Sequence, residues 1–329
     1  MSTRWTWHGG GLGAARAHFG EGALPWLDLS TGINPQPWPH AESLAIDWQS
    51  LPDEGALRDL ERAAAEHFGC DPAHVCAVPG TEVGLRLTGD LLGQASAFHL
   101  TPTYRTHGEI VAGSREIALS EVEKADGETL ILANPNNPDG RLLEPATLMA
   151  WLARRGAKGW LIVDEAFADC HEGMSLAGEV SDHRRLLVFR SFGKFFGLAG
   201  VRLGFVIGPR DVLVAMRARL GAWPVSSAAI AIGTAAYRDT AWIAATRTRL
   251  VEDAAALDRD LAKLGYEARG SCPLFRLIDC GDAQALFDHL ARHAILTRPF
   301  DAEPRWLRLG LPPGAEARER LLSVLALHG

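Results

Sequence analysis

The chain has 329 residues, of which 47% are hydrophobic and 22% charged, a composition typical of a globular protein that excludes a disordered, collagen-like or coiled-coil chain. Its net charge of −7 predicts no basic surface for nucleic acid, and no apolar run reaches the roughly 20 residues of a membrane span. Residues 1–13 show no apolar segment of a secretory signal, so we expect a cytoplasmic protein of about two domains.

Residues 1–50 contain Gly and Pro clusters with little periodicity, and we expect them to lie along the surface of a domain as an N-terminal arm. A helix is predicted over Glu54–Phe68, because apolar residues recur there at helical spacing before Gly69. Short apolar runs then alternate with helical patterns, which is typical of βα units and a mostly parallel sheet. The predicted strands are Val75–Val78, Ala95–Leu100, Thr129–Ala133, Trp160–Val163, Leu186–Phe189 and Leu203–Ile207.

The pattern changes after Gly221 to a long helix rich in Ala and Arg, expected over Thr240–Leu264. Two alternating strands and two further helices are predicted beyond it, at Leu274–Ile278, Trp306–Leu309, Ala283–His293 and Ala315–Leu327. We therefore expect an α/β fold. Residues 51–220 would form a large domain with a mostly parallel central sheet sandwiched by helices, and residues 221–329 a linker helix with a smaller C-terminal α+β domain.

The cysteines give no sign of a metal site. The five of them include no CxxC pair and no His spacing typical of zinc ligands. We expect them to be reduced, buried small hydrophobic residues, and we expect no metal.

Two residues stand where chemistry is expected. Lys194 lies between Gly193 and Phe195 just after a predicted strand, where desolvation would lower the pKa of its ammonium group and free the amine to form a Schiff base. Asp164 follows the apolar run Leu161–Val163, and open α/β sheets place their ligands at the carboxyl ends of such strands. Taken singly, Lys194 would fit a surface lysine in a glycine-rich loop, and Asp164 a carboxylate that caps a turn.

The segment around Lys194 has further features. Ser191 lies three residues before it and Arg202 eight after it, and with them the segment resembles the cofactor-lysine segment of fold type I pyridoxal phosphate (PLP) enzymes of the aminotransferase class I/II superfamily. The resemblance implies the aminotransferase fold, PLP as cofactor and Lys194 as its covalent anchor. It also implies that Asp164 pairs with the pyridine nitrogen, because PLP is an electron sink only while that nitrogen stays protonated.

The resemblance extends in chain order to other positions. Gly80-Thr81-Glu82 opens a helix after a strand, where free N–H groups and the helix dipole would hold the cofactor phosphate together with Ser191 and Arg202. Tyr104 matches the aromatic residue that lies on the PLP ring. Asn137 matches the asparagine that donates to the phenolic O3′ and also contacts substrate; alone, its segment would fit a Pro/Asn turn.

One position departs from the family pattern. Phe167 stands where many aminotransferases carry a tyrosine that hydrogen-bonds O3′. The substitution would leave Asn137 as the main O3′ donor, so we expect tuning of the cofactor that differs from that of an ordinary transaminase.

The N-terminus narrows the resemblance to one branch. His8-Gly9-Gly10 and the segment from Ser30 to Pro35 resemble the threonine-phosphate decarboxylases of cobalamin biosynthesis. This branch implies that the N-terminal arm contributes to the active site, with O-phospho-L-threonine as substrate and (R)-1-amino-2-propanol phosphate and carbon dioxide as products. His8 and Arg298 would bind the substrate phosphate, and Arg308 and the backbone near Gly32 its carboxylate.

Other readings stay open at this stage. The close relative of that branch is the histidinol-phosphate type of aminotransferase, which also takes a phosphorylated amine. A PLP-sensing regulator without catalysis, or an unrelated α/β protein with accidental matches, are the remaining alternatives. The expected partners are a small phosphorylated amino acid and, as the resemblance implies, a second copy in a homodimer, with neither nucleic acid nor membrane.

Overall fold

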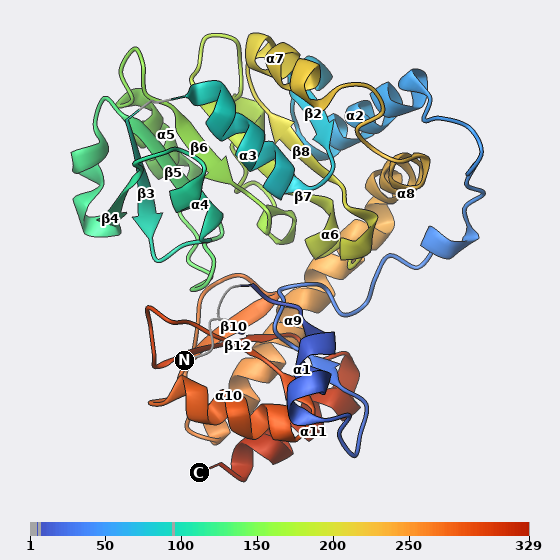
Figure 1. Ribbon diagram of the computed structural model, residues 1–329, viewed down its shortest axis with the longest axis vertical. Helices are drawn as coiled ribbons and strands as arrows, with labels where there is room; N and C mark the ends of the chain where they lie inside the picture. The colour runs from blue at the N-terminus through green and yellow to red at the C-terminus, as the bar shows by residue number, and fades with distance from the viewer. Residues whose placement is uncertain (1–4, 6–7, 94–95, 329) are drawn as a thin grey trace. The chain divides into compact units, whose positions relative to one another are not determined.

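The computed structural model describes residues 5, 8–93 and 96–328 (Figure 1). The chain divides into two compact units. The large unit comprises residues 37–137 and 141–247, and the small unit residues 1–36, 138–140 and 248–329. Part of the segment 1–13 and Ala95, the first residue of one expected strand, lie outside the described residues. The division at residues 50 and 220 that the sequence suggests stays a prediction.

The large unit is built on a seven-stranded sheet. All its strands run parallel except β8, which is antiparallel to both of its neighbours, so the expected mostly parallel sheet is confirmed. In spatial order the strands are β2 (Val75–Val78), β8 (Gly204–Ile207), β7 (Leu186–Ser191), β6 (Leu161–Asp164), β5 (Thr129–Ala133), β3 (Ala97–Thr101) and β4 (Arg115–Ala118).

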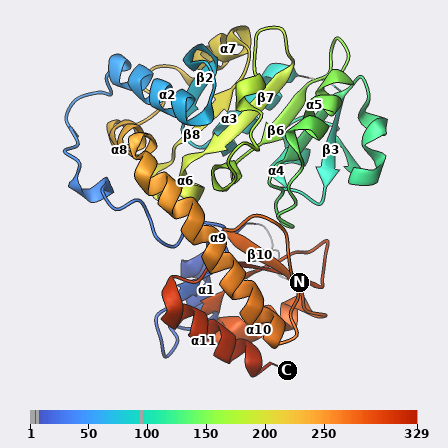
Figure 2. The ribbon, with the colours of Figure 1, turned by 180° about the vertical axis from the view of Figure 1, so that it is seen from behind.

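Helices cover both faces of this sheet. Helix α3 crosses one face in Figure 1, and α2 and α8 lie over the other in Figure 2. Alternation along β8 accounts for this, since a β-carbon at Gly84 of α3 would touch Val206, whereas the ring of Phe205 packs 5.5 Å from that of Phe68 in α2. The helices of this unit are α2 (Glu54–Phe68), α3 (Thr81–Leu92), α4 (Thr106–Glu109), α5 (Pro145–Ala153), α6 (Phe192–Phe195), α7 (Arg210–Leu220) and α8 (Ser227–Arg238).

The predicted helix at Glu54–Phe68 is confirmed, and its ends show why it forms there. The Asp53 carboxylate accepts a hydrogen bond from the Ala56 N–H at the first turn, and Gly69 ends the helix in the left-handed region. Short 3-10 helices lie at Ala41–Ser43, Pro72–His74, Leu119–Ala125, Ala168–Cys170, Ala177–Glu179 and Ala199–Val201.

The small unit contains a four-stranded antiparallel sheet and helices, as expected for an α+β domain. The strand order is β12 (Arg298–Pro299), β13 (Trp306–Gly310), β10 (Phe275–Asp279) and β9 (Ala268–Arg269), and a separate parallel pair joins β1 (Leu27–Asp28) to β11 (Ile295–Leu296). Its helices are α1 (Leu12–Phe19), α10 (Ala283–Arg292) and α11 (Gly314–Ala326), and the long helix α9 (Thr240–Lys263) belongs to both units along the chain.

The N-terminal arm is more ordered than its sequence suggests. Helix α1 has only a weak apolar face, but the ring of Phe19 packs 6.0 Å from Phe287 of α10 and 6.5 Å from Trp26. Tertiary contacts between aromatic rings therefore stabilise helix α1, which its local sequence pattern does not indicate. None of the helices within the described residues is long and apolar enough to span a membrane, and these residues contain no cluster of three or more His, Cys, Asp or Glu suited to a metal ion.

Candidate active site

The carboxyl ends of three adjacent parallel strands meet at one edge of the large sheet. β6 ends at Asp164 and β7 ends at Ser191, and the short helix α6 that follows β7 carries Lys194. β5 lies beside β6 and leads directly into the segment that holds Asn137. Asp164 and Lys194 therefore belong to the same edge of the sheet, where open α/β folds bind their ligands.

Asp164 is fixed by two hydrogen bonds. Its Oδ1 accepts from the Ala166 N–H at 3.0 Å, and its Oδ2 lies 3.0 Å from Nε2 of the fully buried His107. The His107 Nδ1 lies in turn 2.8 Å from the Thr103 hydroxyl. An ionised carboxylate only accepts hydrogen bonds, so in the tautomer that bonds to such a carboxylate His107 carries its proton on Nε2.

His107 is a site residue that the sequence did not indicate. It lies three residues after Tyr104 on the turn that begins α4, and their rings meet edge to face at 5.7 Å between centroids. The spacing of three from a predicted ligand residue is the one signal that would have pointed to it. Its contact to Asp164 joins residues 57 positions apart in the chain.

The predicted residues Tyr104 and Glu82 are in direct contact. The Tyr104 hydroxyl donates to Oε2 of Glu82 at 3.0 Å, and the Thr106 hydroxyl donates to the same carboxylate at 2.9 Å. Burial raises the pKa of Tyr104 to about 12, so the phenol stays protonated and remains a donor. These bonds hold the Tyr104 ring beside His107 and hence beside Asp164.

The segment with Asn137 is tied to the same group of residues. The Asn136 side-chain amide donates to the Pro102 carbonyl at 2.9 Å, and the Thr103 hydroxyl lies 3.4 Å from Oδ1 of Asn136. Asn134 closes the other side of the turn through its hydrogen bonds with the backbone of Leu143. Asn137 itself is buried, and its predicted role at O3′ stays a prediction.

A cradle for an anion lies at the start of α3. Gly80 precedes the helix with a φ of 90°, and a β-carbon there would lie 2.7 Å from a guanidinium nitrogen of Arg202. A β-carbon at Gly204, which pairs with Ser191 across β7 and β8, would lie 2.7 Å from the Thr81 N–H nitrogen. Arg202 thus lies near the positive end of a helix dipole, an arrangement that an anion between them would stabilise.

Lys194 is half-buried next to the residue that departs from the family pattern. Its Nζ lies 6.0 Å from the centre of the Phe167 ring, and Phe167 itself is buried. The ring offers an apolar surface beside the amine where a tyrosine would offer a hydroxyl. The predicted cofactor residues Gly80, Thr81, Glu82, Tyr104, Asn137, Asp164, Ser191, Lys194 and Arg202 all belong to the large unit.

The predicted substrate residues, by contrast, belong to the small unit, apart from Asn137. Arg298 on β12 and Arg308 on β13 are direct partners across the antiparallel pair, and both are buried. A guanidinium nitrogen of Arg308 donates to the Ser30 carbonyl at 2.7 Å. Burial, and then the charge of Arg298, lower the pKa of Arg308 well below its usual range. Two guanidinium groups on adjacent strands form a donor set that suits carboxylate and phosphate oxygens.

The N-terminal arm joins this arginine pair through Ser30. The Gly10 N–H donates to the Ser30 hydroxyl at 2.7 Å, which donates to the Asp28 carboxylate at 2.6 Å. A β-carbon at Gly9 would lie 2.4 Å from the Ser30 carbonyl oxygen, so only glycine permits this approach. His8, which is exposed, is therefore held in the same unit as Arg308, and Gly32 lies two residues beyond Ser30.

Comparison with known proteins agrees with the fold and these motifs. Residues 98–325 match the family model of class I and II aminotransferases, and the chain belongs to this family, whose cofactor is PLP. Among curated proteins, the chain is 41% identical to a threonine-phosphate decarboxylase of a Sinorhizobium species over 97% of each chain. It is 40% identical to the enzyme of the same name from Pseudomonas aeruginosa, over 97% of this chain and 96% of the other.

Solved structures share the fold. A histidinol-phosphate aminotransferase from Sinorhizobium meliloti, crystallised with PLP, aligns with a TM-score of 0.84 at 22% identity, over 97% of this chain and 94% of that one. The expected aminotransferase fold type I is thereby confirmed, and the protein is an enzyme of this class.

The residues present fit the cofactor of the family. The Gly80 cradle with Arg202 offers a place for a phosphate, the buried Asp164 a partner for a pyridinium, and Lys194 an amine at the same edge of the sheet. These three features match the three functional groups of PLP, namely its phosphate, its ring nitrogen and its aldehyde.

Proposed function

We propose that the enzyme decarboxylates O-phospho-L-threonine to (R)-1-amino-2-propanol phosphate, a step of cobalamin biosynthesis. The observation that carries the proposal is the buried pair of Arg298 and Arg308 on adjacent strands. A substrate with both a phosphate and a carboxylate supplies one anion to each guanidinium. The names of the two relatives at 41% and 40% identity support the same substrate.

The large unit would hold the cofactor. When bound, PLP supplies an electron sink for the pair that the broken Cα–carboxylate bond leaves behind. Asp164, held by His107 and the Ala166 N–H, would keep a proton on the pyridine nitrogen. Lys194 would hold the cofactor through Nζ, and the same amine, when it is free, would deliver a proton to Cα. One proton is taken up for each carbon dioxide released.

The small unit would hold the substrate. Arg308 would grip the α-carboxylate and so select the bond from Cα to that group, and not the Cα–H bond, for cleavage. Arg298 would bind the phosphate together with His8, which donates a hydrogen bond even when neutral. The Ser30 hydrogen bonds to Gly10 would keep the arm with His8 close to Arg308, and the backbone near Gly32 would complete the carboxylate site.

Incubation with phosphothreonine tests the reaction directly. We expect carbon dioxide and aminopropanol phosphate in equal amounts, with no keto acid added, because decarboxylation returns the cofactor to its starting state. Gas release and the amine product are both measured. A turnover that requires 2-oxoglutarate and consumes histidinol phosphate would replace this proposal with the aminotransferase alternative.

Replacement of Arg298 tests the phosphate site. In Arg298→Lys we expect kcat/KM for phosphothreonine to fall about tenfold or more, and that for unphosphorylated threonine to change much less, because lysine keeps the charge and loses the two-pronged donor. Arg269→Lys is the matched control, since Arg269 lies exposed on β9 of the same sheet. Equal losses for both substrates would remove Arg298 from the phosphate site.

We also propose that the chain acts as a homodimer in the cytoplasm. The resemblance to fold type I enzymes, which are typically dimers, carries this proposal, and the large unit exposes the apolar side chains of Trp48, Leu51 and Trp223 by more than half. Trp223 borders a pocket of about 330 Å³ next to Arg217. Sedimentation of the purified protein tests the proposal, and a monomer mass at micromolar concentration would contradict it.

A further inference from the structure

A group of buried charges lies directly behind the strand ends that carry Asp164 and Lys194. Arg190, the residue before Ser191 in β7, is inserted between two carboxylates that follow β6. It forms an ion pair with Asp169, and its other guanidinium nitrogen lies 3.5 Å from Glu165. Glu165 and Asp169 are fully buried and Arg190 is 3% exposed. None of these three residues has a role in the mechanism proposed above.

The cluster is joined to the active-site residues through the backbone. The Glu165 N–H donates to the Phe189 carbonyl at 2.8 Å, one residue beyond the pairing of Asp164 with Phe189. Because side chains alternate along a strand, Glu165 and Arg190 lie on the face of the sheet opposite to Asp164 and Ser191. The contact of Arg190 with Glu165 therefore links β7 to the residue that follows β6, on the face of the sheet opposite to Asp164 and Ser191.

Neighbouring elements hold the cluster on all sides. The Leu176 N–H donates to Oε1 of Glu165 at 2.7 Å, and the Ser175 hydroxyl contacts both Glu165 and Arg190. From α2, Nε2 of His67 lies 2.8 Å from Oδ1 of Asp169, and the Phe68 ring lies 4.5 Å from the Arg190 guanidinium carbon. The positions of Glu165 and Arg190 are thus fixed by the surrounding structure.

The charges within the cluster are unequal. Burial works against an ionised Asp169, but Arg190 and then His67 lower its pKa to about 2. Burial raises the pKa of Glu165 to about 7, with Arg190 opposing the shift. Arg247 donates from Nε to the Asp169 carbonyl at 2.8 Å. Two further titratable groups face the cluster, namely Tyr237, whose pKa burial raises well above its usual value, and Cys70, whose pKa burial raises to about 12. Both stay neutral, and Arg190 with Asp169 is the permanent ion pair.

Such a buried cluster of charges is not expected to add much to the free energy of unfolding. Removing two carboxylates and a guanidinium from water costs several kcal/mol per ion, and apolar residues of similar volume often stabilise a fold as well or better. A set of directional bonds, by contrast, specifies one arrangement of the elements that it joins. The two strand ends joined here are those that must present Asp164 and Lys194 to one cofactor.

We propose that Glu165 and Arg190 are positioning residues that lock the end of β6 to the end of β7 and thereby fix Asp164 relative to Lys194. The inference rests on the roles of Asp164 and Lys194 in the proposed function. A positioning role acts on the chemical step and on the properties of the bound cofactor, while the substrate residues of the small unit are unaffected. It predicts a change in kcat without a matching change in KM.

The test compares variants of the PLP-loaded enzyme. Glu165→Gln keeps the shape and removes the charge, and Arg190→Lys keeps the charge and removes the second prong of the donor. In both we expect kcat for phosphothreonine to fall about tenfold or more with KM changed less than about twofold. We also expect the pH midpoint of the cofactor's visible absorption band to shift by about half a pH unit or more. Because Arg190→Lys keeps the positive charge, a shift of the pH midpoint in this variant would report a change in geometry and not a change in charge.

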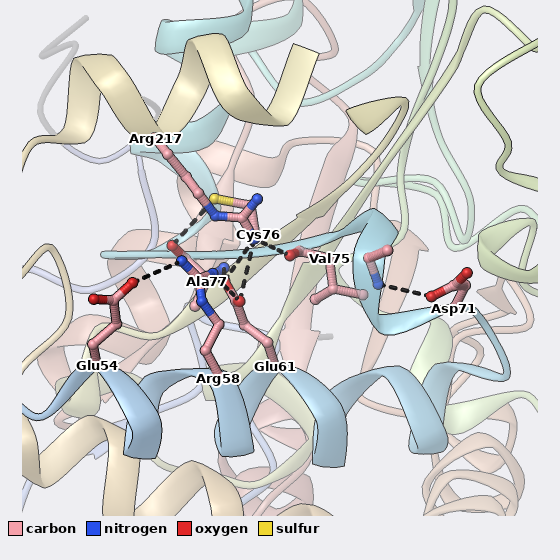
Figure 3. A network of polar contacts seen from close by, with 9 residues as sticks. Glu54, Arg58, Glu61, Asp71, Val75, Cys76, Ala77 and Arg217 are labelled. Atoms are coloured by element: carbon pink, nitrogen blue, oxygen red, sulfur yellow. Dashed lines mark hydrogen bonds and ion pairs between the residues drawn. The ribbon is translucent and has the colours of Figure 1, made fainter. Parts of the chain in front are cut away.

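A second buried glutamate provides the matched control. Glu61 in α2 also lies between arginines, with Arg58 at 2.7 Å and Arg217 at 3.1 Å, and it accepts from the Ala77 N–H at 3.0 Å (Figure 3). It belongs to the same unit but is joined to β2, at the edge of the sheet. We expect Glu61→Gln to lower the melting temperature and to leave kcat and the absorption midpoint unchanged.

The outcomes separate the possible explanations. If Glu165→Gln and Arg190→Lys lower only the melting temperature, as Glu61→Gln does, the cluster is merely structural and the proposal fails. Should Arg190→Lys not fold, the isosteric Glu165→Gln decides alone. If the unaltered enzyme releases no carbon dioxide from phosphothreonine, the proposed function fails, but the absorption midpoints still decide whether the cluster positions the cofactor residues.

Discussion

Lys194→Ala is expected to remove both the visible absorption band that PLP gives with the protein and the turnover of phosphothreonine. The amine at position 194 lies on α6 at the same sheet edge as Asp164, whereas Lys124, Lys158 and Lys263 lie in the 3-10 helix Leu119–Ala125, on the turn before β6 and at the end of α9. Without the amine of Lys194 the cofactor would lack its proposed covalent anchor and Cα its proposed proton donor, so we expect kcat to fall by about 10³-fold or more. Absorption spectra and the carbon dioxide assay measure the two effects.

Lys158→Ala is the control for this variant. Lys158 is exposed in the large unit, on the turn before β6, and should change neither the spectrum nor kcat. An absorption band that persists unchanged in Lys194→Ala would reject Lys194 as the anchor, and with it the arrangement in which one cofactor bridges the ends of β6 and β7.

Asp164→Asn is expected to give the second largest loss. The amide keeps the size of the side chain but lacks the charge proposed to hold a proton on the pyridine nitrogen, so the electron sink would weaken and kcat should fall about 10²-fold or more. The visible band should remain, because Lys194 is intact, with an altered pH midpoint. Asp164→Glu keeps the charge and should recover part of kcat, since the carboxylate is displaced by one methylene.

Asp182→Asn controls for the loss of a carboxylate in the large unit. Asp182 is exposed and pairs with Arg210 at the start of α7, and it lies before the first residue of β7, whereas Asp164 and Lys194 lie at or beyond the carboxyl ends of β6 and β7. Its replacement should leave kcat unchanged. If Asp164→Asn retained kcat within about twofold of the unaltered enzyme, the proton on the pyridine nitrogen would have to depend on another group.

The strands and the long helices could be predicted because their signals are local. The apolar run Leu161–Val163 and the helical spacing within Glu54–Phe68 are written into consecutive residues, and both elements are confirmed. Helix α1 was missed because its eight residues are held by rings from distant parts of the chain. Strands β11 and β12 have two residues each, too few to show any alternation.

The residues of the candidate site could likewise be predicted where their signal is local, and not where it depends on contacts between distant residues. Lys194 and Asp164 are recognisable because each lies beside a strand end in a distinctive segment. The contact of His107 with Asp164 depends on folding that brings together residues 57 positions apart, and that of Arg190 with Asp169 joins residues 21 positions apart. A buried arginine within an apolar strand was itself a signal, because a charge is buried only with a partner.

The residues proposed to hold the cofactor and those proposed to hold the substrate come, with the exception of Asn137, from separate compact parts of the chain. Evolution or a protein engineer can therefore alter which phosphorylated substrate the enzyme recognises, by changing β12 and the N-terminal arm, without rebuilding the residues proposed to hold the cofactor. New specificities on this scaffold should be reachable through substitutions in fewer than half of its residues.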